Sequence, residues 1–374
     1  MNTERKLKIL VLFDFPWWNA AAYYVHNVVL ALESLGHKIY FAGKSGTPIW
    51  TNLENTKVDL YDISFFKTSP LKLLQSYSTV KKIVNEKEID ILVPAVAQGH
   101  IVSGMIKKLN NRRISILKLC LDNVSPVNNP LNKYLHNTLT DYFIFPGQST
   151  KKRYEPLFEI RNFTLLHAPI DLEKFLDYSQ TRKLKKSLGI PDDKIVISFI
   201  GRFSPEKGIF FLLEIIKYAS KKNDKLFFIL SGSEEQIKYS EVEEAIKSKN
   251  LTESVKILTK QDDVRDVLSI ADIGLMSSRY SEYICRIAME FMAFKIPVVA
   301  PELNVIPEVV ENNITGFIYP LNDSFTAAEK LLELAEDINL RNRFGKDGYY
   351  RIQNNYSLNI FTNEISIILK NVIK

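Results

Sequence analysis

The stretch SEYICRIAME, residues 281 to 290, contains three charged side chains whose spacing favours a role in binding. Glu282, Arg286 and Glu290 follow one another at intervals of four, so on a helix they lie along one face. The residues around them are mostly apolar, and such a helix is normally buried. Buried carboxylates need partners, and the hydroxyl groups or phosphates of a ligand would supply them. An exposed ladder of ion pairs is the alternative, and spacing alone does not decide between the two.

The loop GRFSPEKG, which begins at Gly201, is a second candidate site and follows the apolar stretch IVISFI. Ser204-Pro205 is typical of a helix start. Arg202 and Lys207 flank that start, where the backbone amides and the dipole of a helix already favour an anion. The pattern predicts a phosphate or pyrophosphate site without a metal, and two surface charges beside a turn are the alternative.

Two alternating series of strands and helices are expected to hold these loops. The first series begins with a strand at 6–15, a helix that ends at Gly36, and a strand in HKIYFAG. Further apolar strands are expected at 89–96, 113–121 and 141–147. Strand–helix–strand units of this kind build parallel sheets.

The second series follows a stretch punctuated by Pro169, Gly189 and Pro191, which we interpret as the link between two domains. Strands are expected in KIVISFIG, KLFFILSG, SVKILTK, DIGLMSS and IPVVAP, and helices from Asp323 to the end. The chain is therefore predicted to be an α/β protein with two doubly wound parallel sheets and ligands in the loops after the strands. The expected limits are residues 1–175, 176–350 and, for a final helix, 351–374.

Length and composition agree with a folded protein of two domains. A chain of 374 residues is too long for one comfortable core. No apolar run reaches the roughly 20 residues that cross a bilayer, and MNTERKLKILVLFDF is unlike a signal peptide. Cys120 and Cys285 form neither a metal-ligand spacing nor a disulfide framework, so two reduced thiols in the cytosol are expected.

The charge is unevenly distributed along the chain. Up to Phe175 there are 22 Lys and Arg against 15 Asp and Glu, whereas the remainder has 27 against 28. This asymmetry favours an anionic ligand or membrane face beside the first half, and a solvated basic surface is the alternative. Nothing resembles a nucleic-acid-binding motif, so nucleic acid is not expected as a partner.

The two candidate sites together resemble a known family. GRFSPEKG and SSRYSEYICRIAMEFMAFKIPVVAPELNVIPEVVENNITGFIY are similar to the C-terminal half of the retaining glycosyltransferase family 4, and LGHKIYFAG, PIDLEKF and the helical C-terminus fit it too. The resemblance implies the GT-B fold, two Rossmann-like domains facing across a cleft, with the final helix packing back toward the first domain. It also implies sugar transfer from a nucleoside-diphosphate-sugar to a glycan or lipid-linked acceptor, in cell-envelope polysaccharide biosynthesis. The cytoplasm, including the inner face of the cell membrane, is the location expected.

The resemblance also implies roles for individual residues. The first domain would bind the acceptor and the second the donor. Glu282 would contact the transferred sugar, and Glu290 would contact the ribose hydroxyls. Arg202 and Lys207, beside Gly201, would hold the diphosphate and stabilise its charge as it leaves.

Two loops depart from the family's pattern. Asn19 and Ala20 stand where the family usually has a glycine pair. Ala20 still permits a close approach to phosphate, whereas Asn19 brings a side chain into the space of donor or acceptor. The usually glycine-rich loop after the first glutamate contains Tyr283 and Ile284, shortly before Arg286. We infer that Arg286 either replaces some amide contacts to the diphosphate or pairs with the glutamates.

The acceptor side departs from the pattern as well. Many family members have a histidine just before an aspartate at the end of a strand in the first domain, and this chain has Leu121 before Asp122. His100, in AQGH after another strand, is a candidate substitute near the acceptor. A lone histidine is more often structural, so that interpretation stays open.

Neither a metal nor another cofactor is expected. Asp262-Asp263 has no third ligand in reach, and none of the five histidines has a metal-like spacing to a cysteine. A nucleotide-sugar epimerase of the same fold and a catalytically silent glycan- or nucleotide-binding protein remain alternatives to the transferase. A dinucleotide oxidoreductase is set aside, because neither leading strand is followed by Gly-x-Gly-x-x-Gly.

Overall fold

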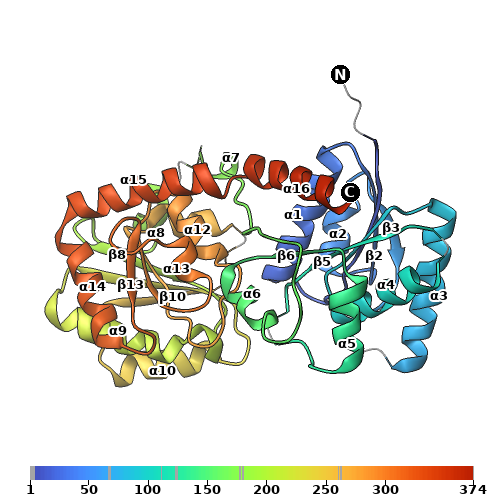
Figure 1. The fold of residues 1–374 in the computed structure, drawn as a ribbon. Coiled ribbons are helices and arrows are strands. Elements are labelled where there is room, and N and C mark those ends of the chain that lie inside the picture. The colour runs from blue at the N-terminus through green and yellow to red at the C-terminus, as the bar shows by residue number, and fades with distance from the viewer. Residues whose placement is uncertain are drawn as a thin grey trace. The chain divides into compact units, whose positions relative to one another are not determined.

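The chain forms two compact units, Met1–Pro169 with Leu358–Lys374, and Ile170–Ser357. The computed structural model describes residues 5–65, 69–110, 112–122, 125–176, 178, 181–259, 261 and 263–373 (Figure 1). The division falls six residues before the boundary predicted at 175. The last helix of the second unit continues to Asn355, so the segment that returns to the first unit begins at Leu358 and not at 351.

The first unit is built on a seven-stranded sheet in the order β3-β2-β1-β4-β5-β6-β7, and each neighbouring pair runs parallel. Its strands are β1 (Lys8–Leu12), β2 (Lys38–Gly43), β3 (Asp59–Asp62), β4 (Ile91–Pro94), β5 (Ser115–Leu119), β6 (Tyr142–Phe145) and β7 (Phe163–Leu165). Its helices are α1 (Ala20–Ser34), α2 (Pro48–Leu53), α3 (Pro70–Lys87), α4 (Ala97–Leu109), α5 (Pro130–Tyr134), the π-helix η1 (Leu135–Leu139), α6 (Gln148–Tyr154) and α16 (Leu358–Val372).

The final helix, α16, packs on α1 within the first unit. The rings of Tyr24 and Phe361 meet edge to face with their centroids 5.7 Å apart, and both side chains are buried. Ser115 at the start of β5 also donates a hydrogen bond to the carbonyl of Val372 at 3.2 Å. Helices therefore cover the central strands, whose side chains are apolar because the sheet faces no water.

The second unit is built on a six-stranded parallel sheet in the order β10-β9-β8-β11-β12-β13. Its strands are β8 (Ile195–Ile200), β9 (Leu226–Gly232), β10 (Val255–Thr259), β11 (Ile273–Leu275), β12 (Val298–Pro301) and β13 (Gly316–Tyr319). Its helices are α7 (Glu173–Leu176), α8 (Thr181–Ser187), the 3-10 helix η2 (Pro205–Lys207), α9 (Ile209–Lys222), α10 (Tyr239–Ser248), α11 (Val264–Ile270), α12 (Arg286–Ala293), α13 (Ile306–Val309), α14 (Ser324–Glu336) and α15 (Ile338–Asn355).

Apolar cores lie on both faces of this second sheet. One core joins the strands to α9, α10 and α14, and includes Phe228 and Leu331. The other joins β12 to α12, α13 and α15, and includes Met289 and Ile352. Such double winding leaves the loops after the strands along one edge of the sheet, which is where α/β proteins bind ligands.

The predicted fold, two Rossmann-like parallel-sheet domains of the GT-B type with a helical C-terminus, is confirmed. Three edge strands, β3, β7 and β13, were not predicted, because each has only three or four residues and too little periodicity to be recognised. No helix among the described residues is long and apolar enough to cross a membrane.

Candidate functional site

The loops after β8 and β11 meet at the carboxyl edge of the second sheet. Lys207, in the first loop, forms an ion pair with Glu282, in the second. The hydroxyl of Ser277 donates a hydrogen bond to the carbonyl of Lys207 at 2.8 Å. Gly208 has φ +66°, and a Cβ there would lie 2.2 Å from the carbonyl oxygen of Ser277, so only glycine lets the loops approach this closely.

Glu282 is held from several sides and is only 8% exposed. Its Oε2 accepts from the Ser278 hydroxyl at 3.0 Å as well as pairing with Lys207. Its backbone N–H donates to the side chain of Asn304 at 2.9 Å, which fixes the loop. Among the described residues, the hydrogen bonds to this carboxylate all go to Oε2. Oε1 can therefore accept a hydrogen bond from a hydroxyl group of a ligand.

The helix α12 begins at Arg286, so Glu282 lies in the loop after β11, as expected, but does not share a helical face with Arg286 and Glu290. Cys285, the residue before the helix, adopts the left-handed conformation with φ 57°. The chain turns there, and Glu282 pairs with Lys207 and not with Arg286. The other two charges behave as expected, because Arg286 Nε donates to Glu290 Oε1 at 2.7 Å.

Glu290 lies inside the second unit and is 4% exposed. Burial raises the pKa of its carboxyl group, and the neighbouring Arg286 works in the opposite direction. Arg286 itself stays about a third exposed, so the pair has a buried and an accessible end. A carboxylate held in this way is suited to accept hydrogen bonds from ligand hydroxyls.

The remaining predicted cation, Arg202, forms an ion pair with Glu235 from the loop after β9. The two side chains are 51% and 39% exposed. Gly201, at the end of β8, lies under the stem of Lys207, whose Cγ would be 3.7 Å from an added Cβ. The two cations of this short loop therefore pair with two different carboxylates, Arg202 with Glu235 and Lys207 with Glu282.

The helix start predicted at Ser204-Pro205 is only a 3-10 turn. That turn, η2, spans three residues, and the hydroxyl of Ser204 makes no capping hydrogen bond. The α-helix begins at Ile209, after Gly208. A turn of three residues has little dipole, so an anion at this loop depends on the side-chain cations more than the sequence suggested.

Tyr283 and Ile284 connect Glu282 to α12. Ile284 is 5% exposed and packs inward, and Tyr283 is half-buried. The carbonyl of Glu282 accepts from the amide of Val305 at 3.2 Å, so the loop after β12 supports this connection. The structure thus brings together, at one edge, the predicted site residues of the second unit.

Comparison with known proteins identifies this unit. Residues 180–351 match the family model described as glycosyl transferases group 1. The second unit is a group 1 glycosyltransferase domain. The resemblance to this family of glycosyltransferases is confirmed at the level of group 1, whereas the narrower assignment to family 4 stays a prediction.

Relatives and solved structures extend the likeness beyond this domain. The N-acetyl-alpha-D-glucosaminyl L-malate synthase of Bacillus anthracis is 23% identical over 328 residues, which cover 84% of each chain. The UDP-Gal:alpha-D-GlcNAc-diphosphoundecaprenol alpha-1,3-galactosyltransferase of Escherichia coli is 25% identical over 195 residues, 50% of this chain and 49% of that relative. The structure of Anabaena HepE in complex with UDP has a TM-score of 0.84 at 18% identity, over 98% of this chain and 100% of its own.

The first unit of this glycosyltransferase uses Asn19 differently from the prediction. The side-chain oxygen of Asn19 accepts from the amide of Ala22 at 2.9 Å and caps α1, whose first residue is Ala20. An asparagine that caps a helix directs its oxygen to the backbone. The expectation that this side chain projects toward a ligand therefore finds no support in the geometry.

His100, the candidate near the acceptor, is 2% exposed and belongs to the core of the first unit. Its Nε2 lies 2.8 Å from the hydroxyl of Thr140, and its ring stands perpendicular to that of His136 at 4.7 Å. Burial lowers its pKa well below the usual value, so the ring is neutral at neutral pH. This environment favours the structural interpretation of His100 over contact with an acceptor.

Asp122 has a partly exposed carboxylate at the carboxyl end of β5. It accepts from the hydroxyl of Tyr154 at 3.0 Å and lies 3.6 Å from the buried Lys118. The ammonium of Lys118 has no hydrogen bond within the described part of the chain. Sequence reasoning missed this lysine, because its neighbours in the strand, ILKL, are apolar.

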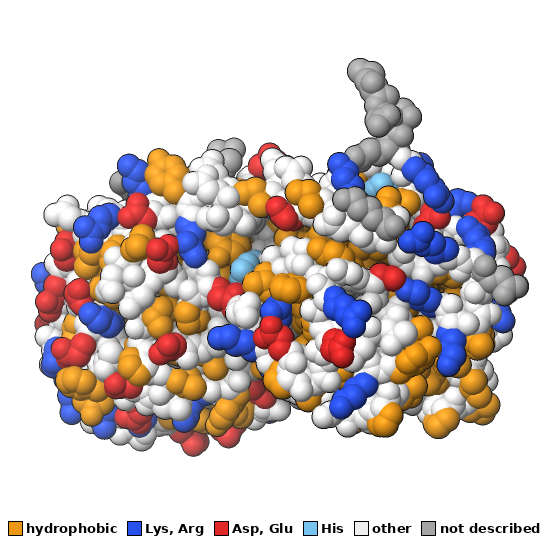
Figure 2. All heavy atoms as spheres, in the orientation of Figure 1, with side chains coloured by type: hydrophobic (Ala, Val, Ile, Leu, Met, Phe, Trp, Pro, Cys, Tyr) orange, Lys and Arg blue, Asp and Glu red, His pale blue; other side chains and the backbone are white. Residues whose placement is uncertain are grey.

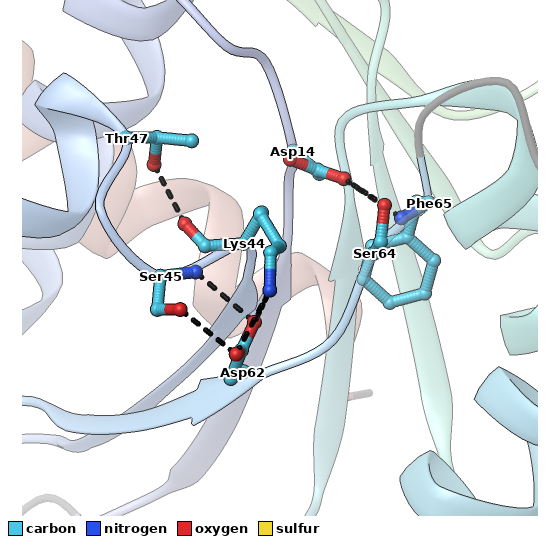
Figure 3. A network of polar contacts seen from close by, with 7 residues as sticks. All are labelled: Asp14, Lys44, Ser45, Thr47, Asp62, Ser64 and Phe65. Carbon is cyan, nitrogen blue, oxygen red and sulfur yellow. Dashed lines mark hydrogen bonds and ion pairs between the residues drawn. The ribbon is translucent and has the colours of Figure 1, made fainter.

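Another missed carboxylate, Asp14, organises the same edge of the first sheet. It is 3% exposed and accepts from the hydroxyl of Ser64 at 2.8 Å and the amide of Phe65 at 2.9 Å (Figure 3). Nearby, Lys44, in the loop after β2, forms an ion pair with Asp62, the last residue of β3. These contacts bind three loops to one another, and no pattern in the sequence revealed them.

The metal prediction stays untested. Asp262 lies outside the described residues, and its neighbour Asp263 accepts from the backbone and guanidinium of Arg265. Among the residues that the structure does describe, no three His, Cys, Asp or Glu side chains gather as metal ligands would.

Proposed function

We propose that this glycosyltransferase moves a sugar from a nucleoside-diphosphate-sugar, bound at the carboxyl edge of the second sheet, to a glycan or lipid-linked acceptor. The observation that carries the proposal is the pairing of Lys207 with Glu282 and of Arg286 with Glu290 at that edge. Cations suit a diphosphate, and accessible carboxylate oxygens suit sugar hydroxyls. The fit of the second unit to the group 1 family supports it.

Each residue has a separate task in this proposal. Lys207 and Arg202 stabilise the negative charge that develops on the departing diphosphate. Glu282 orients the donor sugar through Oε1, because its other oxygen is already bonded. Glu290 accepts the ribose hydroxyls. The crystal structures of Anabaena HepE with UDP and with UDP-glucose support a donor of this class.

Retention of the anomeric configuration and independence from metal are part of the proposal. The cationic loop supplies charge stabilisation that a metal would otherwise provide. The leaving phosphate itself would take the proton of the acceptor hydroxyl, so none of the residues above is given the role of general base. Asp122 and Ala20, in the first unit, remain candidates for acceptor and donor contacts.

The acceptor class is proposed from the relatives and from charge. The relative from Escherichia coli is named for a lipid-linked acceptor, and the one from Bacillus anthracis for L-malate. The first unit has 23 Lys and Arg against 14 Asp and Glu, whereas the second has 26 against 29. A basic first unit fits an acceptor at the anionic inner face of the cell membrane, in cell-envelope polysaccharide biosynthesis.

The surface of the first unit offers a place for such membrane contact. Leu71 and Leu74, in the first turns of α3, are 68% and 55% exposed, and Lys72 lies between them. Figure 2 shows hydrophobic side chains among lysines over α3 to α5. Sedimentation with phosphatidylglycerol vesicles should be lost in Leu71→Asp/Leu74→Asp and kept in Ile338→Asp, which changes a side chain of similar exposure in the second unit. Equal sedimentation of both variants would contradict this contact.

The transfer itself is tested by incubating the protein with UDP-, GDP- and ADP-sugars and a membrane extract as acceptor source. Wild type should release nucleoside diphosphate from one donor class and lengthen an acceptor detected by mass spectrometry. Lys207→Gln should reduce both by about 10²- to 10³-fold, and Lys222→Gln, which changes the ion pair between α9 and α14, should not. Interconversion of the donor sugar without release would show an epimerase instead, and no reaction with any donor would favour the silent binding protein.

A further inference from the structure

We propose that Glu235 is an internal counter-ion for Arg202, and that the diphosphate of a bound nucleotide displaces it. The inference rests on the proposed function, because it concerns the same donor site. Glu235 thereby sets how tightly the nucleotide is held and how fast the product leaves. The starting observation is that the carboxylate and the guanidinium form an ion pair across the loops after β9 and β8.

Backbone pairing holds these two loops together without help from the ion pair. The amide of Phe203 donates to the carbonyl of Ser233 at 2.8 Å. The amide of Ile237 donates in turn to the carbonyl of Phe203 at 3.1 Å. Because both loops are fixed in this way, the Glu235 carboxylate is presented to Arg202 at a defined place, and removing its charge leaves the loops joined.

The ion pairs of the two cations in this loop differ in burial. The side chains of Lys207 and Glu282 are 20% and 9% exposed, and the hydroxyl of Ser278 adds a third contact. Those of Arg202 and Glu235 are 51% and 39% exposed. Breaking a buried pair leaves an uncompensated charge, whereas an exposed pair contributes little and is screened by water. The pair that a ligand can open is therefore the exposed one.

A diphosphate is the better partner for the guanidinium of Arg202. It carries more negative charge than one carboxylate, and its oxygens match the planar fork of arginine in two parallel hydrogen bonds. In exchanging partners, Arg202 swaps the single carboxylate of Glu235 for the phosphate groups. The released carboxylate remains nearby and pairs with Arg202 again as the product leaves, so it competes with the diphosphate for the same guanidinium.

The balance of charge at this edge points the same way. Every predicted donor-site cation is already paired with a carboxylate, so these side chains together bear no net charge. The pairs are Arg202–Glu235, Lys207–Glu282 and Arg286–Glu290. Of the three carboxylates, Glu282 and Glu290 are buried, whereas Glu235 is 39% exposed and pairs, within the described part of the chain, with Arg202. Neutralising Glu235 would therefore leave the guanidinium of Arg202 without its counter-ion and open to an anion.

The test is titration calorimetry of UDP, GDP and ADP with wild type, Glu235→Gln and Glu329→Gln. Glu329, in α14, pairs with Lys222 at the C-terminal end of α9, and its exposure, 44%, is close to the 39% of Glu235. Glu235→Gln should lower the Kd of the nucleotide that binds by about two- to fivefold, the scale of an exposed ion pair. Nucleotide dissociation measured by stopped flow should slow by a similar factor. Glu329→Gln should change neither.

The double variant Arg202→Gln/Glu235→Gln shows whether Glu235 acts as the counter-ion of Arg202 or merely repels the negatively charged nucleotide. In the Arg202→Gln background, adding Glu235→Gln should leave the Kd unchanged, because the cation that the carboxylate holds is already gone. An equal gain in both backgrounds, or an unchanged Kd in wild type, would overturn the inference while leaving the proposed function intact. If none of the three nucleotides bound wild type, the proposed function would fall and this inference with it.

Discussion

The carboxyl edges of the two sheets use their charged side chains in different ways. In the second unit, cations and carboxylates form ion pairs that stay partly accessible, between two loops in Arg202–Glu235 and within α12 in Arg286–Glu290. In the first unit, His100 and Lys118 are buried, and Asp14 and Asn19 bond the backbone. The same architecture thus holds partly accessible ion pairs at the carboxyl edge of one sheet and a buried polar network at that of the other.

This contrast explains why one half of the protein reveals its chemistry in its sequence more readily. Charged side chains that stay accessible can exchange their partners for a ligand. Those that are buried or bonded to the backbone are committed to the fold, since leaving a buried polar group without a partner destabilises it. Changes at the accessible ion pairs of the second unit should therefore alter binding and catalysis, whereas changes at the buried polar groups of the first unit, such as His100 and Asp14, should alter stability.

The largest effect is expected from Lys207→Gln. Loss of a donor aimed at developing negative charge typically lowers kcat by about 10²- to 10³-fold, and we expect a loss on that scale in nucleotide release. Lys207→Arg should recover part of the activity, because charge is kept while geometry changes. Steady-state kinetics of nucleotide release measure kcat for both variants. A fully active Lys207→Gln would show that Lys207 has no catalytic role.

Glu290→Gln should weaken nucleotide binding by about ten- to a hundredfold, the scale of hydrogen bonds to a charged group. In wild type, affinity should also fall as the solution is acidified. Burial raises the pKa of Glu290 above 4.5, so its carboxylate is protonated at a higher pH than that of an exposed glutamate. Calorimetry at several pH values measures this, and Glu290→Gln, which has no carboxylate there, should show a flatter profile. Parallel profiles for the two proteins would contradict the assignment.

The first unit should lose stability in mild acid. Burial lowers the pKa of His136 from 6.5 to about 4, so the folded state resists protonation that the unfolded chain accepts. The free energy of unfolding should therefore be unaffected above pH 6.5 and fall by up to about 1.4 kcal/mol per pH unit between 6.5 and 4. His136→Phe keeps the stacking on Phe158 and should reduce this slope in urea unfolding. An unchanged slope would show that other groups cause it.

The smallest effect is expected at Cys285. Its left-handed backbone, φ 57°, is unfavourable for any residue with a Cβ, whereas glycine adopts it without strain. Cys285→Gly and Cys285→Ala both lose the buried sulfur, but only the first relieves the backbone. Urea unfolding should find Cys285→Gly more stable than Cys285→Ala by about 1 kcal/mol. The reverse order would mean that this conformation is not strained.

Much of the fold could be predicted from sequence, because buried parallel strands are continuous apolar runs and stand out beside amphipathic helices. The edge strand β3, DLYD, could not, since its four residues are neither a continuous apolar run nor an alternation of polar and apolar residues. Within the site, GRFSPEKG and the Arg286–Glu290 spacing predicted real neighbours. The turn at Cys285 was not visible in the sequence, so the pairing of Glu282 with Lys207 could not be predicted.

Contacts between loops were the hardest part to predict. Glu235 and Asn304 follow different strands, and only the strand order brings them to Arg202 and Glu282. Neither that order nor the direction in which each loop leaves its strand can be predicted from the patterns in this sequence. Burial posed a second difficulty. Lysine side chains usually reach solvent, and the burial of Lys118 becomes apparent only when the strand lies in its sheet.

Hydrogen exchange of wild type, measured by mass spectrometry with and without UDP, GDP and ADP, tests the position of the donor site most directly. We expect one nucleotide to slow exchange in the loop 201–208 and in 281–293 of the second unit. Peptides around His100 and Lys118 should exchange at the same rate with or without it. Protection confined to the first unit, with none in these two segments, would contradict the assignment of the donor site to the carboxyl edge of the second sheet.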